Sequence, residues 1–265
     1  TGAALATVIS TFFQAAFLSV LFFSRRFDSE YQTRGSWPFD WNRIREIFRI
    51  GLPAAMTMFF DVANWWIFVS FIVGYFGAVQ LAANAIALGF MHVCFMPAVG
   101  LNHGVAAIVG QWLGRGEVAR AKARTYTAMR IAIGYMMAMG GIFALFGDKI
   151  ILLVFKTEAD VAGLGHKILI LSAFFQAFDA VNIISTGALR GAGDTRWMMF
   201  MTIIMSYVLF LPLALLFGII LNGGAIGAWC GAMIFIILLS AVLFHRFYSE
   251  VWRGINIFKY STPEK

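Results

Sequence analysis

The chain has 265 residues, of which 61% are hydrophobic and only 12% are charged, and its mean hydropathy is +0.81. Soluble domains carry about 25% charged residues, so this composition excludes a soluble globular protein and indicates an integral membrane protein. The net charge of +7 could suggest nucleic-acid binding, but the basic residues are spread between apolar spans and form no single patch with stacking aromatics. We therefore expect a lipid bilayer around the chain and no nucleic-acid partner.

Apolar runs of about 20 residues, the length that crosses a bilayer, predict about seven transmembrane helices. They fall at residues 1–23, 51–73, 81–109, 131–146, 161–186, 197–217 and 225–244. Pro97 predicts a kink in the third span, and Pro212 predicts an interruption in the sixth. The expected fold is an all-α polytopic membrane protein.

The segments between the spans are polar. Residues 24–50 read as a connector that ends in an interfacial amphipathic helix at residues 41–50. Residues 111–130 are expected to form a basic loop, and residues 147–160 a charged connection with a short surface helix. Gly187 opens a glycine-rich stretch that we expect to break the fifth span and turn the chain.

The basic residues predict the orientation in the membrane. Seventeen of the 20 Lys and Arg residues lie on one side of the alternating spans. Positive charge favours the cytoplasmic side, so the C-terminal tail is expected in the cytoplasm. The expected location is the cell (inner) membrane, with a multi-pass topology.

The beginning of the chain suggests a piece of a longer polypeptide. It opens on Thr1 without an initiator Met, inside an apolar run. The small-residue pattern that starts at Gly2 is repeated at Gly227, each time at the start of a span that ends in arginine. Such repetition hints at two related halves, as in many transporters.

Two carboxylates, Asp61 and Asp179, lie well inside apolar spans with no basic residue deep enough to pair with them. A charge at the centre of a membrane helix costs roughly 2.5–3.5 kcal/mol on insertion scales, so its presence points to function. At about 1.5 Å per residue, both lie roughly 12–15 Å from the predicted cytoplasmic ends of their helices. Asn64 and Asn182 follow them by three residues each, on the same helical faces.

This pattern predicts one site. Asp61 and Asp179 could hold a hard cation such as Na⁺, which prefers oxygen ligands, or a proton. Asn64, Asn182 and Gln176 are the expected supporting polar groups. The alternative is that each carboxyl group is protonated and hydrogen-bonded to a neighbouring helix as structural glue.

Other residues carry weaker signals. Asn84 and Asn102 could line a water-filled path or form hydrogen bonds between helices, and Asn84 is the further candidate for the site. Cys94 and Cys230 lie in apolar spans, where small buried hydrophobes are expected and no disulfide or metal pair. The sequence lacks a Gly-x-x-x-x-Gly-Lys-[Ser/Thr] phosphate loop and the common hydrolase and metalloprotease motifs, so we expect no enzyme. A seven-helix receptor is suggested only by the number of spans.

Several stretches together resemble the second half of the multidrug and toxic compound extrusion (MATE) antiporters. They are Arg49-Ile-Gly-Leu-Pro53, Phe59-Phe-Asp61, Val109-Gly-Gln-Trp-Leu-Gly-Arg-Gly-Glu117, Phe178-Asp179 and Gly187-Ala-Leu-Arg-Gly-Ala-Gly-Asp-Thr195. The resemblance implies a two-lobe (6+6) transporter. Residues 1–23 would be the last helix of the N-terminal lobe, 24–50 a cytoplasmic linker, 51–247 the C-terminal six-helix lobe, and 248–265 a cytoplasmic tail.

The resemblance also implies a function. It is the export of organic cations or amphipathic compounds in exchange for Na⁺ or H⁺, with the N-terminal lobe of the same polypeptide as partner and no cofactor besides the coupling ion. In one branch of the family, acidic residues that match Asp61 and Asp179 bind that ion; many relatives carry Glu at the first position, which leaves the choice of ion open. The alternative is a flippase of lipid-linked precursors from the same superfamily.

Overall fold

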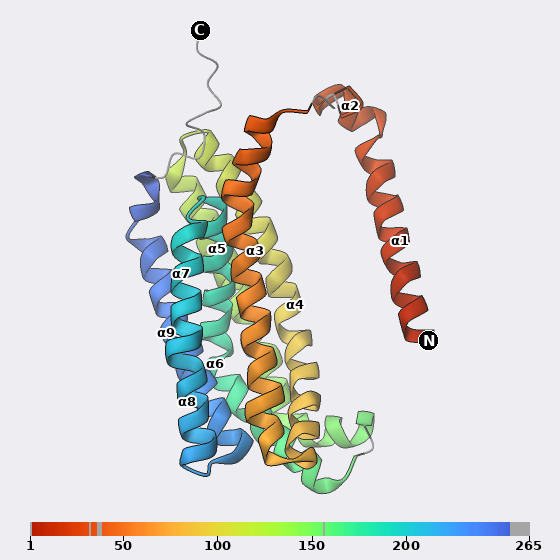
Figure 1. Ribbon diagram of the computed structural model, residues 1–265, viewed down its shortest axis with the longest axis vertical. Helices are drawn as coiled ribbons and strands as arrows, with labels where there is room; N and C mark the ends of the chain where they lie inside the picture. The colour runs from red at the N-terminus through yellow and green to blue at the C-terminus, as the bar shows by residue number, and fades with distance from the viewer. Residues whose placement is uncertain (1, 32, 36–38, 156, 255–265) are drawn as a thin grey trace. The chain divides into compact units, whose positions relative to one another are not determined.

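The computed structural model describes residues 2–31, 33–35, 39–155 and 157–254, and every regular element in them is helical (Figure 1). The α-helices are α1 (Gly2–Phe22), α2 (Arg25–Tyr31), α3 (Trp41–Ile67), α4 (Ala78–Gly114), α5 (Val118–Phe155), α6 (Ala159–Gly191), α7 (Thr195–Ile204), α8 (Leu211–Leu215) and α9 (Gly224–Tyr248). The π-helical turns are η1 (Phe68–Val73), η3 (Met205–Phe210) and η4 (Leu216–Ile220), and the 3-10 turns are η2 (Gly74–Phe76) and η5 (Val251–Gly254).

The prediction of seven membrane spans is confirmed. In the described part of the chain, seven helices are long and apolar enough to cross a bilayer. They are Ala4–Phe22, Gly51–Phe76, Ala78–Gly114, Val118–Phe155, Ala159–Gly191, Thr195–Ile220 and Gly224–Tyr248. Most of the expected tail, from residue 255 onward, lies outside the described residues.

The chain divides into two compact units, Thr1–Phe48 and Arg49–Lys265. In the first unit, residues 33–35 fold back on the end of α1. The Thr33 hydroxyl donates to the carbonyl of Phe22 over 2.9 Å, and the Arg34 Nε donates to the carbonyl of Phe23 over 3.0 Å. All the buried apolar residues of the described chain belong to the second unit.

Several predicted helix ends are wrong. The expected basic loop at 111–130 is mostly helix, because only residues 115–117 separate α4 from α5, and Gly116 closes that turn with φ +77°. The expected connection at 147–160 is mostly the end of α5, which continues to Phe155. The amphipathic helix expected at residues 41–50 is helical, but it continues into the second span without a break, as α3. The 38 residues of α5 span about 57 Å, against a hydrocarbon core of about 30 Å. Hydropathy finds only the part of a helix that lies in lipid, whereas helical hydrogen bonding continues beyond it.

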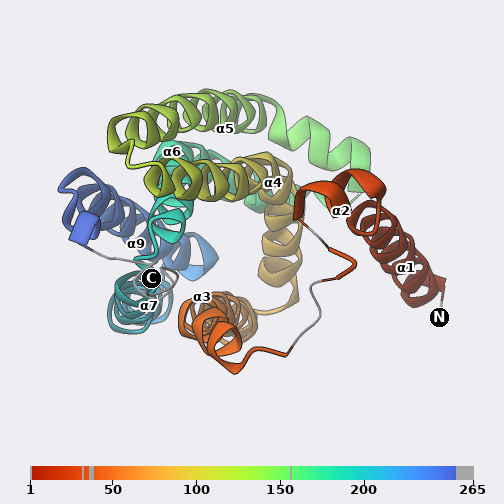
Figure 2. The ribbon, with the colours of Figure 1, turned by 90° about the horizontal axis from the view of Figure 1, so that it is seen from above.

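The two prolines predicted to distort helices lie where the helix geometry changes. α4 contains Pro97 and changes direction along its length (Figure 2). Pro212 lies at the start of α8, between the π-helical turns η3 and η4. Proline lacks an N–H and displaces the carbonyl one turn earlier, which disturbs the local hydrogen bonds in both helices.

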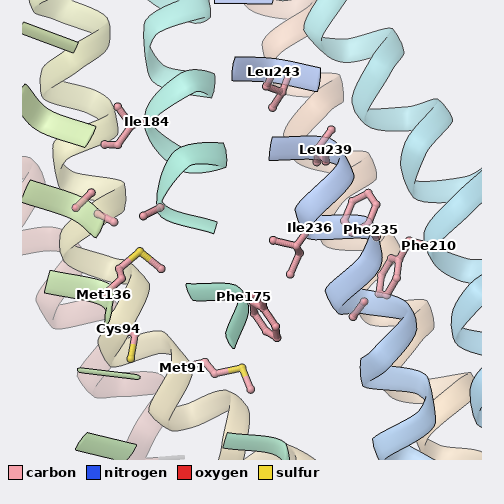
Figure 3. Packing of buried hydrophobic residues seen from close by; sticks show 14 of the residues in the cluster. Met91, Cys94, Met136, Phe175, Ile184, Phe210, Phe235, Ile236, Leu239 and Leu243 are labelled. Carbon is pink, nitrogen blue, oxygen red and sulfur yellow. The ribbon is translucent and has the colours of Figure 1, made fainter. Parts of the chain in front are cut away.

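α6 is the central helix of the second unit. It packs against α4, α5 and α9 (Figure 2). Figure 3 shows Phe175 of α6 between Met91 of α4 and Ile236 of α9, so one core joins both sides of the helix. α6 therefore has a packing partner on three sides.

α6 also corrects the expectation of a loop at Gly187, because the helix continues to Gly191 and only residues 192–194 form the turn. A Cβ on Gly187 would lie 2.5 Å from the carbonyl oxygen of Asn102, and one on Gly191 would clash with the carbonyl of Ala106. Small residues four apart let two membrane helices approach closely. These glycines are therefore packing residues where α6 crosses α4.

The turns 115–117 and 192–194 lie at the same end of the second unit as the end of α9 (Figure 1). This arrangement agrees with the alternating order of the spans. That this end faces the cytoplasm stays a prediction.

At this end, α5 is tied to the segment after α9 through Glu250. Lys122 donates a hydrogen bond to Glu250, and Arg253 Nη2 lies 2.6 Å from its second carboxylate oxygen. The hydrogen bond from Lys122, with the charge of Arg253, lowers the pKa of Glu250 below its ordinary value. A carboxylate with a lowered pKa stabilises the folded state above its ordinary pKa, and this contribution is lost as the pH falls through the folded value.

We therefore expect Glu250→Gln to lower the thermal unfolding temperature at neutral pH. The difference from the wild type should begin to shrink as the pH falls below about 4, near the ordinary pKa of glutamate, and should disappear below the lowered pKa of the folded state. Unfolding followed in detergent across this pH range measures it, and a difference that stays constant with pH would contradict the assignment.

Candidate functional site

Asp61 lies in the second half of α3, one turn before Trp65. Its carboxylate is half-buried. Ring contacts hold this part of α3 against the rest of the unit: Phe60 meets Tyr207 at 6.0 Å and Trp65 meets Phe210 at 5.3 Å between ring centroids. The position of Asp61 therefore follows from aromatic packing on the π-helical turn η3.

Asp179 lies in the middle of the central helix α6 and is also half-buried. The Asn182 Nδ2 lies 3.5 Å from its Oδ1, which is a long hydrogen bond. Phe175, one turn earlier, is buried against Trp229 of α9, with ring centroids 6.2 Å apart. The tight packing of α6 leaves Asp179 little freedom to move along the helix axis.

Neither carboxylate has a basic partner. Among the described residues, no ion pair includes Asp61 or Asp179, and Asn182 is the hydrogen-bond partner of Asp179. An unpaired negative charge away from water is costly. Each of the two carboxylates is therefore suited to hold a cation or a proton.

The neighbouring amides differ in how far their hydrogen-bonding groups are used. Asn64 is completely buried, and neither its oxygen nor its nitrogen has a partner among the described residues. A buried amide without partners costs free energy, so this side chain has an oxygen and a nitrogen available for a ligand. Gln176 is 3% exposed and lies against Gly140 of α5.

The side-chain oxygen of Asn84 is already hydrogen-bonded to another helix. Its Oδ1 accepts a hydrogen bond of 2.8 Å from the indole nitrogen of Trp229, which leaves only its Nδ2 without a partner among the described residues. Asn102 likewise donates to the carbonyl of Ile183 over 2.5 Å. The sequence left two roles open for these asparagines: lining a water-filled path or forming hydrogen bonds between helices. Both form hydrogen bonds between helices.

Cys94 is fully buried in the core, as the sequence predicted for a small hydrophobe. One further feature of this region was not foreseen. Aromatic rings surround Trp229: Trp65, Phe68 and Phe175 lie within 6.2 Å of it. Their spacing along the sequence gives no signal, because the helices that carry them are far apart in the chain.

The oxygen atoms available here suit a hard cation that binds only a few protein ligands. No group of three or more His, Cys, Asp or Glu side chains gathers in the residues that the structure describes, so a transition-metal site is not supported there. Carboxylate oxygens of Asp61 and Asp179 and the free amide oxygen of Asn64 are ligands that Na⁺-like ions accept. A proton needs only one of the carboxylates.

The MatE family profile matches residues 53–216, which is more than half of the chain. A "Probable multidrug resistance protein NorM" of Xylella fastidiosa (strain 9a5c) is 30% identical over 248 residues, covering 93% of this chain and 52% of the relative. The "Multidrug resistance protein MdtK" of Yersinia pseudotuberculosis serotype O:1b (strain IP 31758) is 33% identical over 207 residues, covering 76% of this chain and 44% of the relative. The chain spans about half the length of these curated relatives.

Solved structures share the fold. The "eukaryotic MATE transporter AtDTX14" matches with a TM-score of 0.81 at 22% identity, covering 95% of this chain and 56% of that one. A "MATE in the bent conformation" matches with a TM-score of 0.80 at 18% identity, covering 94% and 55%. With seven membrane helices, a matching fold and the family profile over most of the second unit, the chain belongs to the MATE family of membrane transporters.

Proposed function

We propose that this chain is part of a secondary active transporter that exports organic cations or other amphipathic compounds in exchange for Na⁺ or H⁺. The observation that carries the proposal is the Asp61–Asp179 pair, two half-buried carboxylates on different membrane helices that have no ion-pair partner among the described residues. The names of the relatives, which are multidrug resistance proteins, support export of foreign compounds.

In the proposed mechanism, the gradient of the coupling ion acts on the protein through binding of that ion to the carboxylate pair. Without a bound ion the two charges repel each other, and with one they are held together. Since Asp61 lies on α3 and Asp179 on the central helix α6, the ion changes the preferred arrangement of these helices. A ligand shifts a conformational equilibrium only through different affinity for the two states, so substrate and ion must favour different states or compete for the same groups.

The amides give this site a further property. Asn64 and Asn182 each follow a carboxylate by three residues on its own helix, so an ion held by both carboxylates has a neutral oxygen beside it from each side. Neutral ligands add coordination without adding charge, which keeps binding weak enough for release. This supports a transported ion, bound and released in every cycle.

Transport in vesicles tests the proposal. The complete polypeptide that contains this chain would be reconstituted in liposomes, and movement of a fluorescent organic cation would be followed after a Na⁺ or an H⁺ gradient is imposed. We expect export driven by one of the two gradients and dissipated by the matching ionophore. Transport that needs neither gradient, or that follows added nucleotide, would overturn the proposal.

A further inference from the structure

A groove of about 460 Å³ opens between the start of α7 and the end of α9, away from the carboxylate pair. Residues on both helices line it, including Trp197, Leu238, Ala241, Val242, His245 and Arg246. The lining changes character along α9. Leu238, Ala241 and Val242 are apolar, and the next turn carries His245 and Arg246.

The length of this groove suits a lipid. From residue 238 to residue 249, α9 rises by roughly 16 Å, enough for the upper part of an acyl chain and a headgroup. The apolar residues belong to the membrane span Gly224–Tyr248, whereas Ser249 lies just beyond its end. Trp197 stands at the same end, where tryptophan is enriched at membrane interfaces.

The polar end of the groove is arranged for negative charge. Asp194 is only 4% exposed, and its Oδ2 accepts a 2.8 Å hydrogen bond from Arg246 Nε. The guanidinium of Arg246 also lies over the Trp197 ring, 4.7 Å from its centroid. The ion pair and the ring fix Arg246. Its two Nη groups have no hydrogen-bond partner among the described residues, so they can donate to a ligand in the groove.

The start of α7 adds to this positive end. Asp194 occupies the cap position of α7 but makes no cap hydrogen bond, because its carboxylate is paired with Arg246. The first amide N–H groups of the helix are thus left for an anion. Arg196, in the first turn, is exposed and has no ion-pair partner among the described residues.

We propose that this groove binds an anionic phospholipid, with an acyl chain along Leu238–Val242 of α9 and the phosphate at Arg246 and the start of α7. The commitment to an anionic lipid rests on charge. The carboxylate of Asp194 is buried and paired with Arg246, and that of Glu250, between the lining residues Ser249 and Val251, is paired with Lys122 and Arg253. The charge that the described residues leave unpaired here is therefore positive, and a choline headgroup would bring a like charge to it. The proposal depends only on the membrane location of the chain and stands whether or not the chain transports drugs.

Quenching by brominated lipids tests the proposal at the groove itself. The complete polypeptide that contains this chain would be purified and placed in phosphatidylcholine vesicles in which a minor fraction is brominated phosphatidylglycerol or, in parallel, brominated phosphatidylcholine. The chain has eight tryptophans, so the signal of Trp197 is obtained as the difference between wild type and Trp197→Phe. We expect this difference to be quenched preferentially by brominated phosphatidylglycerol.

A pair of matched variants shows whether the preference belongs to this groove. His245→Glu adds a negative charge to the lining and is expected to lower the preference roughly fivefold, the effect of one charge at an anionic surface. Thr127→Glu adds the same charge to a second groove, between α4 and α5, that Thr127 and Arg124 line, and should leave the preference at Trp197 unchanged. Both positions are exposed, so neither variant should disturb folding.

Equal quenching by the two brominated lipids would overturn the proposal, because some other occupant would then fill the groove. An equal loss of preference in Thr127→Glu would overturn it as well, since the attraction would belong to the whole basic end of the protein. Retention of phosphatidylglycerol by the wild type, but not by His245→Glu, in native mass spectrometry would support the site independently of fluorescence.

Discussion

Replacing Asp179 by Asn in the complete transporter is expected to remove gradient-driven export while leaving membrane insertion intact. The amide keeps the size of the side chain and its contact with Asn182 but can neither bind a cation through charge nor carry a proton. The gradient-driven rate should therefore fall to the background measured without a gradient. Vesicle transport with imposed Na⁺ or H⁺ gradients measures the loss and identifies the ion.

Asp61→Asn should have the same effect, and the double variant should be little worse than either single change, because in the proposed mechanism both carboxylates bind one ion. Asp160→Asn provides the control. Asp160 lies in the first turn of the same helix α6 and is exposed, so its loss should not change the rate. Wild-type export in both single variants would rule out the carboxylate pair as the coupling site.

Replacing Gly187 by Ala should strongly destabilise the second unit. The added Cβ would lie 2.5 Å from the backbone oxygen of Asn102 and 3.0 Å from its side-chain nitrogen. A backbone atom cannot turn away as a flexible side chain can, so α4 and α6 must separate, and the hydrogen bond from Asn102 to Ile183 would be lost with them. Overpacking of this kind costs about 3 kcal/mol, which lowers the unfolding temperature by roughly 6–12 °C in a chain of this size.

Gly163→Ala is the matched control for this prediction. Gly163 lies on the same helix with nothing within 4 Å of its added Cβ, so alanine should be tolerated there. Thermal unfolding of both variants in detergent, followed by size-exclusion chromatography, makes the comparison. Equal unfolding temperatures would show that the crossing of α4 and α6 is looser than the structure describes.

The sequence predicted those features that depend on composition alone. Seven spans follow from the cost of exposing polar groups to lipid. The proposal of a site at Asp61 and Asp179 rests on the same cost and stays a prediction. Helix ends could not be predicted in this way. Residues 118–130 are basic and lie outside the apolar run, yet they are part of α5. In the water outside the bilayer both helix and loop are stable, so hydropathy does not show where the helix begins.

Partnerships between helices also escaped prediction, since they depend on the angles at which helices cross. Gly187 lies in a glycine-rich stretch that is typical of a loop, yet it is a contact residue between α6 and α4. Only the proximity of α4 reveals this role. The polarity of Asn84 is likewise explained by its hydrogen bond with Trp229, 145 residues further along the chain. The motifs that resemble the MATE family supplied what composition could not, and the family profile removes the grounds for a seven-helix receptor.

The contribution of α9 to the core bears on how the protein is made. Of the described spans, α9 leaves the ribosome last, yet it supplies Trp229 to the aromatic cluster and Phe235, Ile236 and Leu239 to the core beside α6. Until it enters the membrane, Asn84 lacks the indole that satisfies its oxygen. A nascent chain that stalls before α9 would therefore lie in the bilayer with the Asn84 oxygen unpaired and with the face of α6 that packs on α9 uncovered.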